Sequence, residues 1–182
     1  MKRIIILSVA CIGILSGCSS PPPVYNYTAG STMTVEGAMT IGQFKYLPAE
    51  VGGKIKENEI ESFYPLLTAV IDKPIKEYFR AAVFNESRLV GIDVKDSKNV
   101  LTGEIITFSW HHDLTEGDFT LEVKYIISSA DHKECYNKIH TTKKTAPNSF
   151  GGSTHNRTWN EVIKINIEKA FQDPQFVSCI RP

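Results

Sequence analysis

The sequence predicts an α+β domain in which a mostly antiparallel sheet of about four or five strands is packed by two main helices. Residues 119–128 alternate apolar with polar side chains, as a strand with one buried and one solvated face requires. Residues 73–88 and 158–172 instead repeat their apolar side chains every three or four positions, as amphipathic helices do. A sheet with one apolar face needs a layer over that face, so we expect both helices to cover it.

The first residues have the pattern of a secretory signal. Lys2 and Arg3 precede an apolar run, Ile4 to Ile14, that is too short to span a bilayer as a stable helix. Residues 15–18 then read Leu-Ser-Gly-Cys, which resembles a bacterial lipobox. The resemblance implies a lipoprotein signal peptide over 1–17, a diacylglyceryl group on the sulfur of Cys18, and a fatty acid such as palmitate on the new amino end. Two or three such chains hold a protein on a membrane almost permanently. The alternative is an ordinary signal peptide with a chance cysteine.

The chain after this leader is long enough for one domain and a tether rather than for two domains. Residues 18–32 include three successive prolines and little that could pack, so we expect a lipidated tether there, with an ordered arm as the alternative. Residues 33–182 are then a single α+β domain. Without the leader, 18 basic residues face 20 acidic ones, a net charge of −2, and no basic stripe is present. We therefore expect no nucleic-acid partner.

Strands are expected on both sides of the first helix. Residues 33–47 are spaced like a strand with an irregularity at Gly37 or Gly42. Residues 48–62 contain a glycine pair and a charged run, which predicts a loop. Residues 90–94 are expected to form a short strand.

Both helices carry start signals. Asp72 is a side-chain acceptor with a proline two residues later, a typical helix opening. The spacing of this helix places Glu86 largely on the side away from the apolar face. Thr158 and Glu161 match the capping-box pattern at the start of the second helix, and the Asp-Pro pair at 173–174 is expected to end it.

A three-strand meander lies between the helices. The apolar phase of residues 100–110 slips by one position, which predicts a bulge between Gly103 and Ile106. Residues 134–144 are much more polar than residues 119–128, as an edge strand is.

Two cysteines remain if the leader is removed and Cys18 is lipidated, because Cys11 leaves with the leader. In an oxidising compartment Cys135 and Cys179 are candidates for a disulfide. Two buried free thiols are the alternative.

The polar residues assemble no convincing catalytic or metal site. His111 and His112 are neighbours on a predicted strand and so point to opposite faces, while His132 lies in a turn at the other end of the meander. Glu161 and Glu168 lie seven residues apart on the second helix, where carboxylates are usually only solvated. Gly-x-Ser-x-Gly is absent. We assign no catalytic residue, metal or cofactor and predict that the protein is not an enzyme.

The order of lipobox, tether, strand, helix, meander and final helix resembles that of small bacterial envelope lipoproteins of the YajG-like type, and more loosely of transport-auxiliary and lipopolysaccharide-assembly lipoproteins. Four segments carry the resemblance: DKPI at 72–75, LTGEI at 101–105, FTLEVKY at 119–125 and INIE at 165–168.

The resemblance implies a non-catalytic binding or assembly accessory whose partner is another envelope protein. Ser19, directly after the lipidated cysteine, fits outer-membrane sorting in enteric bacteria, so we expect a protein anchored in the outer membrane and facing the periplasm, with the inner membrane as the alternative. The second functional hypothesis is a carrier of lipid or another small molecule, with an apolar cavity between the sheet and the helices.

Overall fold

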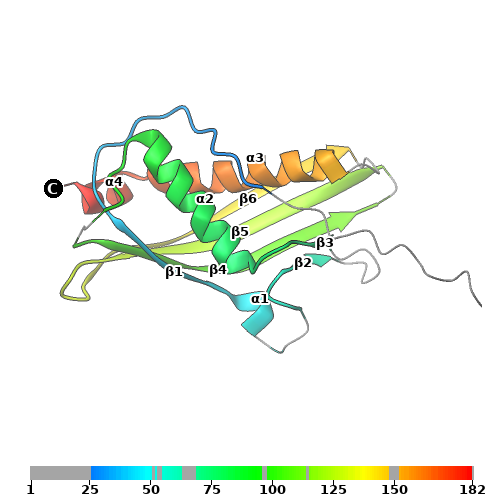
Figure 1. Cartoon of the computed structure of the whole chain (residues 1–182), viewed down its shortest axis with the longest axis horizontal. Helices are drawn as coiled ribbons and strands as arrows, with labels where there is room; N and C mark the ends of the chain where they lie inside the picture. The colour runs from blue at the N-terminus through cyan, green and yellow to red at the C-terminus, as the bar shows by residue number, and fades with distance from the viewer. Residues whose placement is uncertain are drawn as a thin grey trace, which may run out of the picture.

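The structure, a computed structural model, describes residues 26–50, 52, 55–62, 69–95, 98–113, 115–147 and 152–181. Its elements are β1 (Thr40–Tyr46), α1 (Leu47–Glu50), β2 (Glu59–Ser62), β3 (Ala69–Val70), α2 (Ile75–Val90), β4 (Val100–His112), β5 (Glu116–Ser128), β6 (Glu134–Pro147), α3 (Gly152–Phe171) and α4 (Pro174–Ile180). The α+β prediction is confirmed, since α2, α3 and α4 lie together over one face of the sheet (Figure 1). Within the described ranges, no helix combines the length and the apolar character needed to cross a membrane.

β4 is the centre of a six-stranded sheet. One of its edges pairs antiparallel with β5, which pairs antiparallel with β6. Its other edge pairs in parallel with β1 at one end and with β2 at the other, and β3 joins β2 antiparallel. The expectation of a loop over residues 48–62 is therefore wrong at both ends, because α1 includes residues 48–50 and Glu59–Ser62 forms β2, which adds a strand to the sheet.

The predicted bulge in the first long strand is confirmed. The pairing of β4 with β5 shifts register between Ile105 and Thr107, which keeps both Ile105 and Phe108 on the buried face. Gly103 lies just before the shift, where a β-carbon would come within 2.5 Å of a ring atom of Phe44. The missing side chain at Gly103 thus lets the Phe44 ring approach the backbone of β4.

Aromatic side chains fill the space between the sheet and the helices. The ring centroid of Phe79 on α2 lies 5.3 Å from the ring centroid of Phe44 and 6.3 Å from that of Tyr125. At the other end of the core, the rings of Phe108 and Trp159 are 4.2 Å apart. These contacts place the buried faces of β1, β4 and β5 directly against α2 and α3.

The first long helix begins later than the sequence suggests. Its N-cap is Pro74, without a side-chain hydrogen bond, so Asp72 does not cap it. The N–H of Ile75 instead donates to the carbonyl of Glu57 at 2.7 Å. A loop carbonyl distant in the sequence thus replaces the expected local cap.

The same helix also extends beyond the predicted boundary. Val90 is its last residue, and Gly91 follows with a φ of 98°, the left-handed conformation that glycine adopts at helix ends. The strand expected over 90–94 is therefore wrong, and only a single bridge joins Asp93 to Ala38.

The capping box predicted for the second long helix is also wrong. α3 already begins at Gly152, so Thr158 is buried inside the helix, and Glu161 forms an ion pair with Lys144 of β6. The predicted end is confirmed, because the Asp173 carboxylate caps a new helix, α4, by accepting from the N–H of Gln175 at 2.9 Å.

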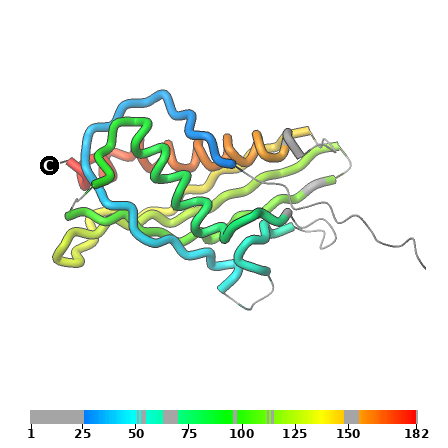
Figure 2. Tube along the Cα trace, viewed as in Figure 1, coloured from blue at the N-terminus to red at the C-terminus, as the bar shows by residue number. Residues whose placement is uncertain are grey.

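An extended arm, residues 26–39, precedes β1 and crosses the helices on the side of the molecule opposite to the sheet (Figures 1 and 2). Residues 26–31 belong to the segment expected to be a tether, yet they pack against α2 and α3. The first strand consequently begins at Thr40 rather than near residue 33. Residues 18–25 of the predicted tether lie outside the described residues.

Candidate functional site: the open face of the sheet

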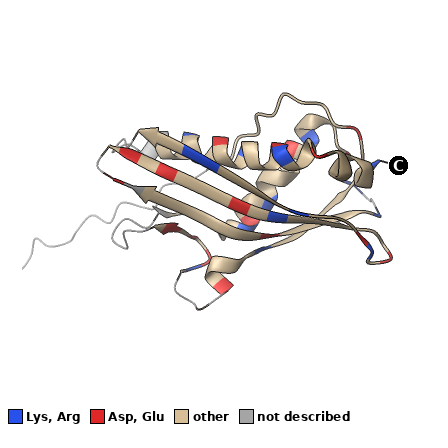
Figure 3. Ribbon diagram, turned by 180° about the vertical axis from the view of Figure 1, so that it is seen from behind, with Lys and Arg blue, Asp and Glu red and all other residues tan. Residues whose placement is uncertain are grey.

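The four strands β1, β4, β5 and β6 present one face to the helices and leave the other uncovered (Figures 1 and 3). Alternate residues point outward and share cross-strand rows, as the pleat requires. We call their side chains the open sheet face: Lys45, Thr102, Glu104, Thr107, Thr120, Glu122, Lys124, Ile126, Asn137, Ile139, Thr141 and Lys143.

One row crosses all four strands. Lys45 pairs with Glu104, Glu104 with Lys124, and Lys124 with Ile139. The Glu104 carboxylate lies 3.8 Å from the ammonium group of Lys45 and 3.8 Å from that of Lys124. Because these side chains are partly exposed, the ion pairs contribute little to stability. The row keeps one net positive charge, because a single glutamate lies between two lysines.

The neighbouring rows are held by hydroxyl groups. Thr141 donates to the Glu122 carboxylate at 2.8 Å, and Thr145, nearer the end of β6, donates to Asp118 at 2.6 Å. Figure 3 shows that charges of both signs are spread along the strands. The face is therefore polar, with three lysines and two glutamates, and Ile126 and Ile139 are apolar side chains on it.

The outer edge of the sheet, β6, is where the sequence predicts an edge strand, and this prediction is confirmed. The edge is partly protected. Lys169 donates to the carbonyl of Thr141 at 2.6 Å, Asn166 to that of His140 at 2.8 Å, and Gln175 to that of Cys135 at 2.8 Å. Helix side chains thus engage part of the backbone of β6, although the carbonyls of the neighbours His140 and Thr141 point to opposite sides of the strand and only one of them lies on the open edge. This leaves the face of the sheet, rather than the β6 edge, as the better docking surface.

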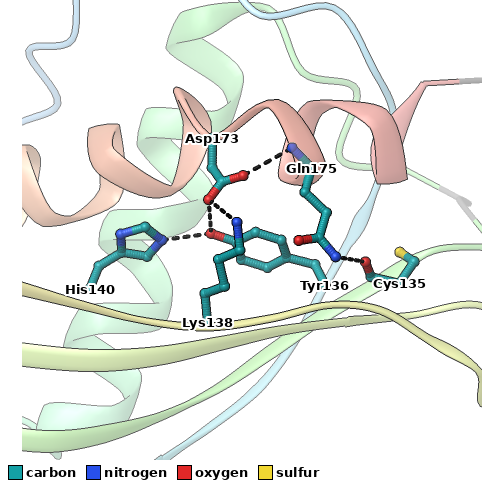
Figure 4. A network of polar contacts seen from close by, with 6 residues as sticks. All are labelled: Cys135, Tyr136, Lys138, His140, Asp173 and Gln175. Atoms are coloured by element: carbon teal, nitrogen blue, oxygen red, sulfur yellow. Dashed lines mark hydrogen bonds and ion pairs between the residues drawn. The ribbon is translucent and has the colours of Figure 1, made fainter.

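A polar network ties the junction of α3 and α4 to β6 (Figure 4). The Tyr136 hydroxyl lies 2.6 Å from Nε2 of His140 and 3.4 Å from Oδ2 of Asp173, and Lys138 donates to the same carboxylate oxygen at 2.7 Å. Since these side chains partner one another, the arrangement is typical of a structural network.

Burial and charge set the protonation of this network. Burial lowers the pKa of His140, and Asp173 offsets part of that effect. Burial alone would raise the pKa of Asp173, but the hydrogen bonds from Lys138 and the Gln175 N–H outweigh it and lower that pKa. Burial raises the pKa of Tyr136, so its phenol stays protonated.

The two cysteines proposed as a disulfide are joined in the structure. Cys135 at the start of β6 and Cys179 in α4 form a bridge with a Cα to Cα distance of 5.9 Å. The bridge fastens α4 to the same end of β6 as the network around Asp173. Cys18, the lipidation candidate, lies outside the described residues.

The histidines and glutamates that the sequence singled out do not converge. His111 is exposed near the end of β4, His132 lies in the turn between β5 and β6, and the side chain of His112 lies outside the described residues. Glu161 pairs with Lys144, while Glu168 accepts a hydrogen bond from Ser31. In the part of the chain that the structure describes, no three His, Cys, Asp or Glu side chains gather as metal ligands would.

Sequence reasoning misplaced one carboxylate. Glu86, expected on the solvated side of its helix, is 0% exposed. Glu86 lies three to seven residues after Phe79, Ala82 and Val83, at the spacing of the buried face of the helix. This spacing alone could have predicted that Glu86 is buried. The network around His140 and Asp173 was also missed, because its members are distant in the sequence.

Known proteins support the fold but assign no family. Neither a family model nor a curated protein matches the sequence. A Xanthomonas campestris protein described as DUF330 has a similar fold, with a TM-score of 0.62 and 13% identity over 86% of this chain and 94% of that one. A structure described only as an uncharacterized protein has a TM-score of 0.51, with 7% identity over 82% of this chain and 98% of that one. A minor lipoprotein from Acinetobacter baumannii has a TM-score of 0.40, with 9% identity over 57% of this chain and 87% of that one. This similarity is too distant to support an argument.

Proposed function

We propose that this chain is a bacterial envelope lipoprotein, anchored through acyl groups on Cys18 at the periplasmic side of the outer membrane, and that it acts as a non-catalytic binding or assembly accessory. The Leu-Ser-Gly-Cys motif and Ser19 support the anchor and its destination. The observation that carries the binding role is the open sheet face, which the described helices leave uncovered.

The size of this face suits a protein partner. Four strands spaced about 4.8 Å apart, of which β1 is the shortest with 7 residues, give a surface on the order of 700 Å². A standard interface buries about 800 Å² on each partner. The open sheet face can therefore hold one protein, in an interface at the small or transient end of the range.

The chemistry of the face favours a polar partner. Glu104 is already paired with Lys45 and Lys124, so the centre offers neither a strong positive nor a strong negative field. Threonine hydroxyls can both donate and accept hydrogen bonds. We therefore propose another envelope protein with a polar surface. The carrier hypothesis has no specific observation in its favour, because aromatic rings occupy the region between sheet and helices.

Photo-crosslinking in living cells tests this function. A crosslinking amino acid is placed at Thr107 or Lys143 on the open sheet face, or at Ala81, which is exposed on α2. We expect a reproducible envelope protein to be captured from the two sheet positions and lost in a Cys18→Ala variant. Capture only from Ala81, or no capture from a correctly anchored protein, would exclude the open sheet face as the docking surface.

A charge reversal provides a matched control. Glu122→Lys breaks the contact with Thr141 in the middle of the face, whereas Glu77→Lys makes the same change on the exposed side of α2. We expect only the first to abolish the crosslink. Equal effects would point to net charge rather than to the face.

A further inference from the structure

The arm that precedes β1 is locked to the helices by one buried carboxylate. Oε1 of Glu86 accepts from the hydroxyl of Tyr27 and from the N–H of Gly30 at 3.0 Å, and Oε2 accepts from the N–H of Ser31 at 3.1 Å. Glu86 itself is 0% exposed. A buried carboxylate is stable only with such partners, so these contacts hold the arm and the helix together.

The arm also makes hydrogen bonds with α3. The Ser31 hydroxyl donates to Glu168 at 2.7 Å, and the Asn160 side chain donates to the carbonyl of Asn26 at 3.2 Å. The Tyr27 ring packs edge-on against Tyr78, with 6.5 Å between centroids. The described part of the arm therefore begins at Asn26, between α2 and α3, on the side opposite to the open sheet face (Figure 2).

We propose that Glu86 is a latch that sets the orientation of the anchored domain: it keeps the helix layer toward the bilayer and the open sheet face away from it, available to a protein partner. This inference rests on the proposed lipid anchor at Cys18.

The length of the segment between Cys18 and the arm limits which face of the domain can lie on the bilayer. Eight residues separate Cys18 from Asn26, and a fully extended chain of that length spans at most about 28 Å. A helix layer packed on a sheet is about 20 Å thick, and the chain would also have to run sideways from the groove to the edge of the domain before passing it. With the latch closed, crossing the two layers uses about 20 Å of this reach and leaves at most about 8 Å for the sideways run, which favours the helix layer as the side toward the lipid.

Opening the latch removes this limit. Once the contacts of Asn26 and Ser31 with α3 are released as well, the next backbone hydrogen bond of the arm runs from the N–H of Val35 to the carbonyl of Val90 at 2.9 Å. Seventeen residues then separate the anchor from the domain, and such a segment reaches about 60 Å. Either face could then approach the bilayer, so the latch decides which surface a partner meets.

Energy transfer to the membrane tests the orientation. Lipidated full-length protein is placed in vesicles of phosphatidylethanolamine and phosphatidylglycerol that carry an acceptor dye on the headgroup. A fluorescent amino acid replaces either Ala81, exposed on α2, or Lys143, on the open sheet face. We expect the transfer rate to be about threefold higher from position 81, because the sheet lies about 10 Å beyond the helix layer. Equal transfer, or a higher rate from position 143, would overturn the orientation.

Substitutions at the latch test its cause. We expect Glu86→Ala to bring the ratio of the two transfer rates close to one, while Glu77→Ala, a matched change on the exposed side of α2, leaves it unchanged. If Glu86→Ala does not fold, as judged by circular dichroism, Tyr27→Phe combined with Ser31→Pro removes two of the three donors and leaves the helix sequence intact. An unchanged ratio in a folded latch variant would refute the role of Glu86.

The anchor is measured separately. Mass spectrometry of the N-terminal peptide shows whether Cys18 carries acyl groups. An unmodified Cys18 would refute the proposed anchor, and coupling its thiol to a maleimide lipid in the same vesicles would still test the orientation. Failure of the proposed function and failure of the latch are thus distinguishable.

Discussion

Tyr27 donates its hydroxyl hydrogen to the carboxylate of Glu86, 59 residues further along the chain. Burial and this hydrogen bond raise the pKa of Tyr27, so the phenol remains a donor throughout the physiological range. A contact over such a distance in sequence joins the arm to the core of the domain. The Tyr27 hydroxyl is therefore one of the three donors through which Glu86 holds the arm.

Removing the Tyr27 hydroxyl should loosen the arm without unfolding the domain. In Tyr27→Phe, Glu86 keeps the N–H donors of Gly30 and Ser31. We therefore expect the free energy of unfolding to fall by about 1 kcal/mol, which is typical of a single hydrogen bond. Hydrogen exchange should become faster at those two amides, as measured by mass spectrometry. Unchanged exchange in the arm would show that the phenol does not hold it, and Glu77→Gln is the control.

Asn166 should be among the most sensitive polar residues of the core. It is 0% exposed, accepts from the Tyr125 hydroxyl at 2.8 Å and donates to the carbonyl of His140 at 2.8 Å. Asn166→Ala leaves the buried hydroxyl and carbonyl without these contacts, so we expect a loss of about 2 to 4 kcal/mol in urea unfolding. Asn137→Ala, on the exposed side of β6, should change stability by no more than about 0.5 kcal/mol. A similar loss in both variants would contradict the special role of Asn166.

The disulfide should stabilise the end of the molecule that α4 covers. The bridged cysteines are 44 residues apart, for which loop entropy predicts a contribution of at most about 4 kcal/mol. We expect a reductant to lower the urea midpoint of the unaltered protein and to leave a Cys135→Ser/Cys179→Ser double variant unaffected. Detection of two free thiols in the oxidised protein would refute the bridge.

Acid should weaken the attachment of α4 to β6. The pKa of His140 is lowered from its ordinary value of 6.5, so below that pH the unfolded chain binds a proton that the folded protein does not. Stability should therefore fall as the pH drops below about 6.5. The pKa of Asp173 is also lowered, so its contribution is present above the ordinary value of 3.8 and is lost as the pH falls through the folded pKa.

Unfolding at about pH 7.5 and about pH 5.5 separates the His140 effect from that of Asp173. His140→Gln should reduce the difference in the free energy of unfolding between these two conditions. His132→Asn, a change in the exposed turn between β5 and β6, should leave that difference as it is. If His140→Gln keeps the full difference, another group is responsible.

The sequence by itself determined the elements whose signals are local. Alternation over β5 follows from the opposite directions of successive side chains, and the phase slip in β4 marked its bulge because one extra residue reverses that alternation. The helical periodicity of α2 and α3 likewise depends only on residues three or four apart. The Leu-Ser-Gly-Cys motif that supports the anchor at Cys18 is equally local and needs no fold to be recognised.

Only the tertiary structure decided the features that distant segments make together. β2 has four residues and becomes a strand because it pairs with β4, and α2 begins at Ile75 because the carbonyl of Glu57 receives its N–H. The buried position of Glu86 requires an arm that begins about 60 residues earlier, and the lowered pKa of His140 requires burial beneath the α3–α4 junction. Such contacts depend on which surfaces meet after folding, and the periodicity of a single segment carries no information about its partner.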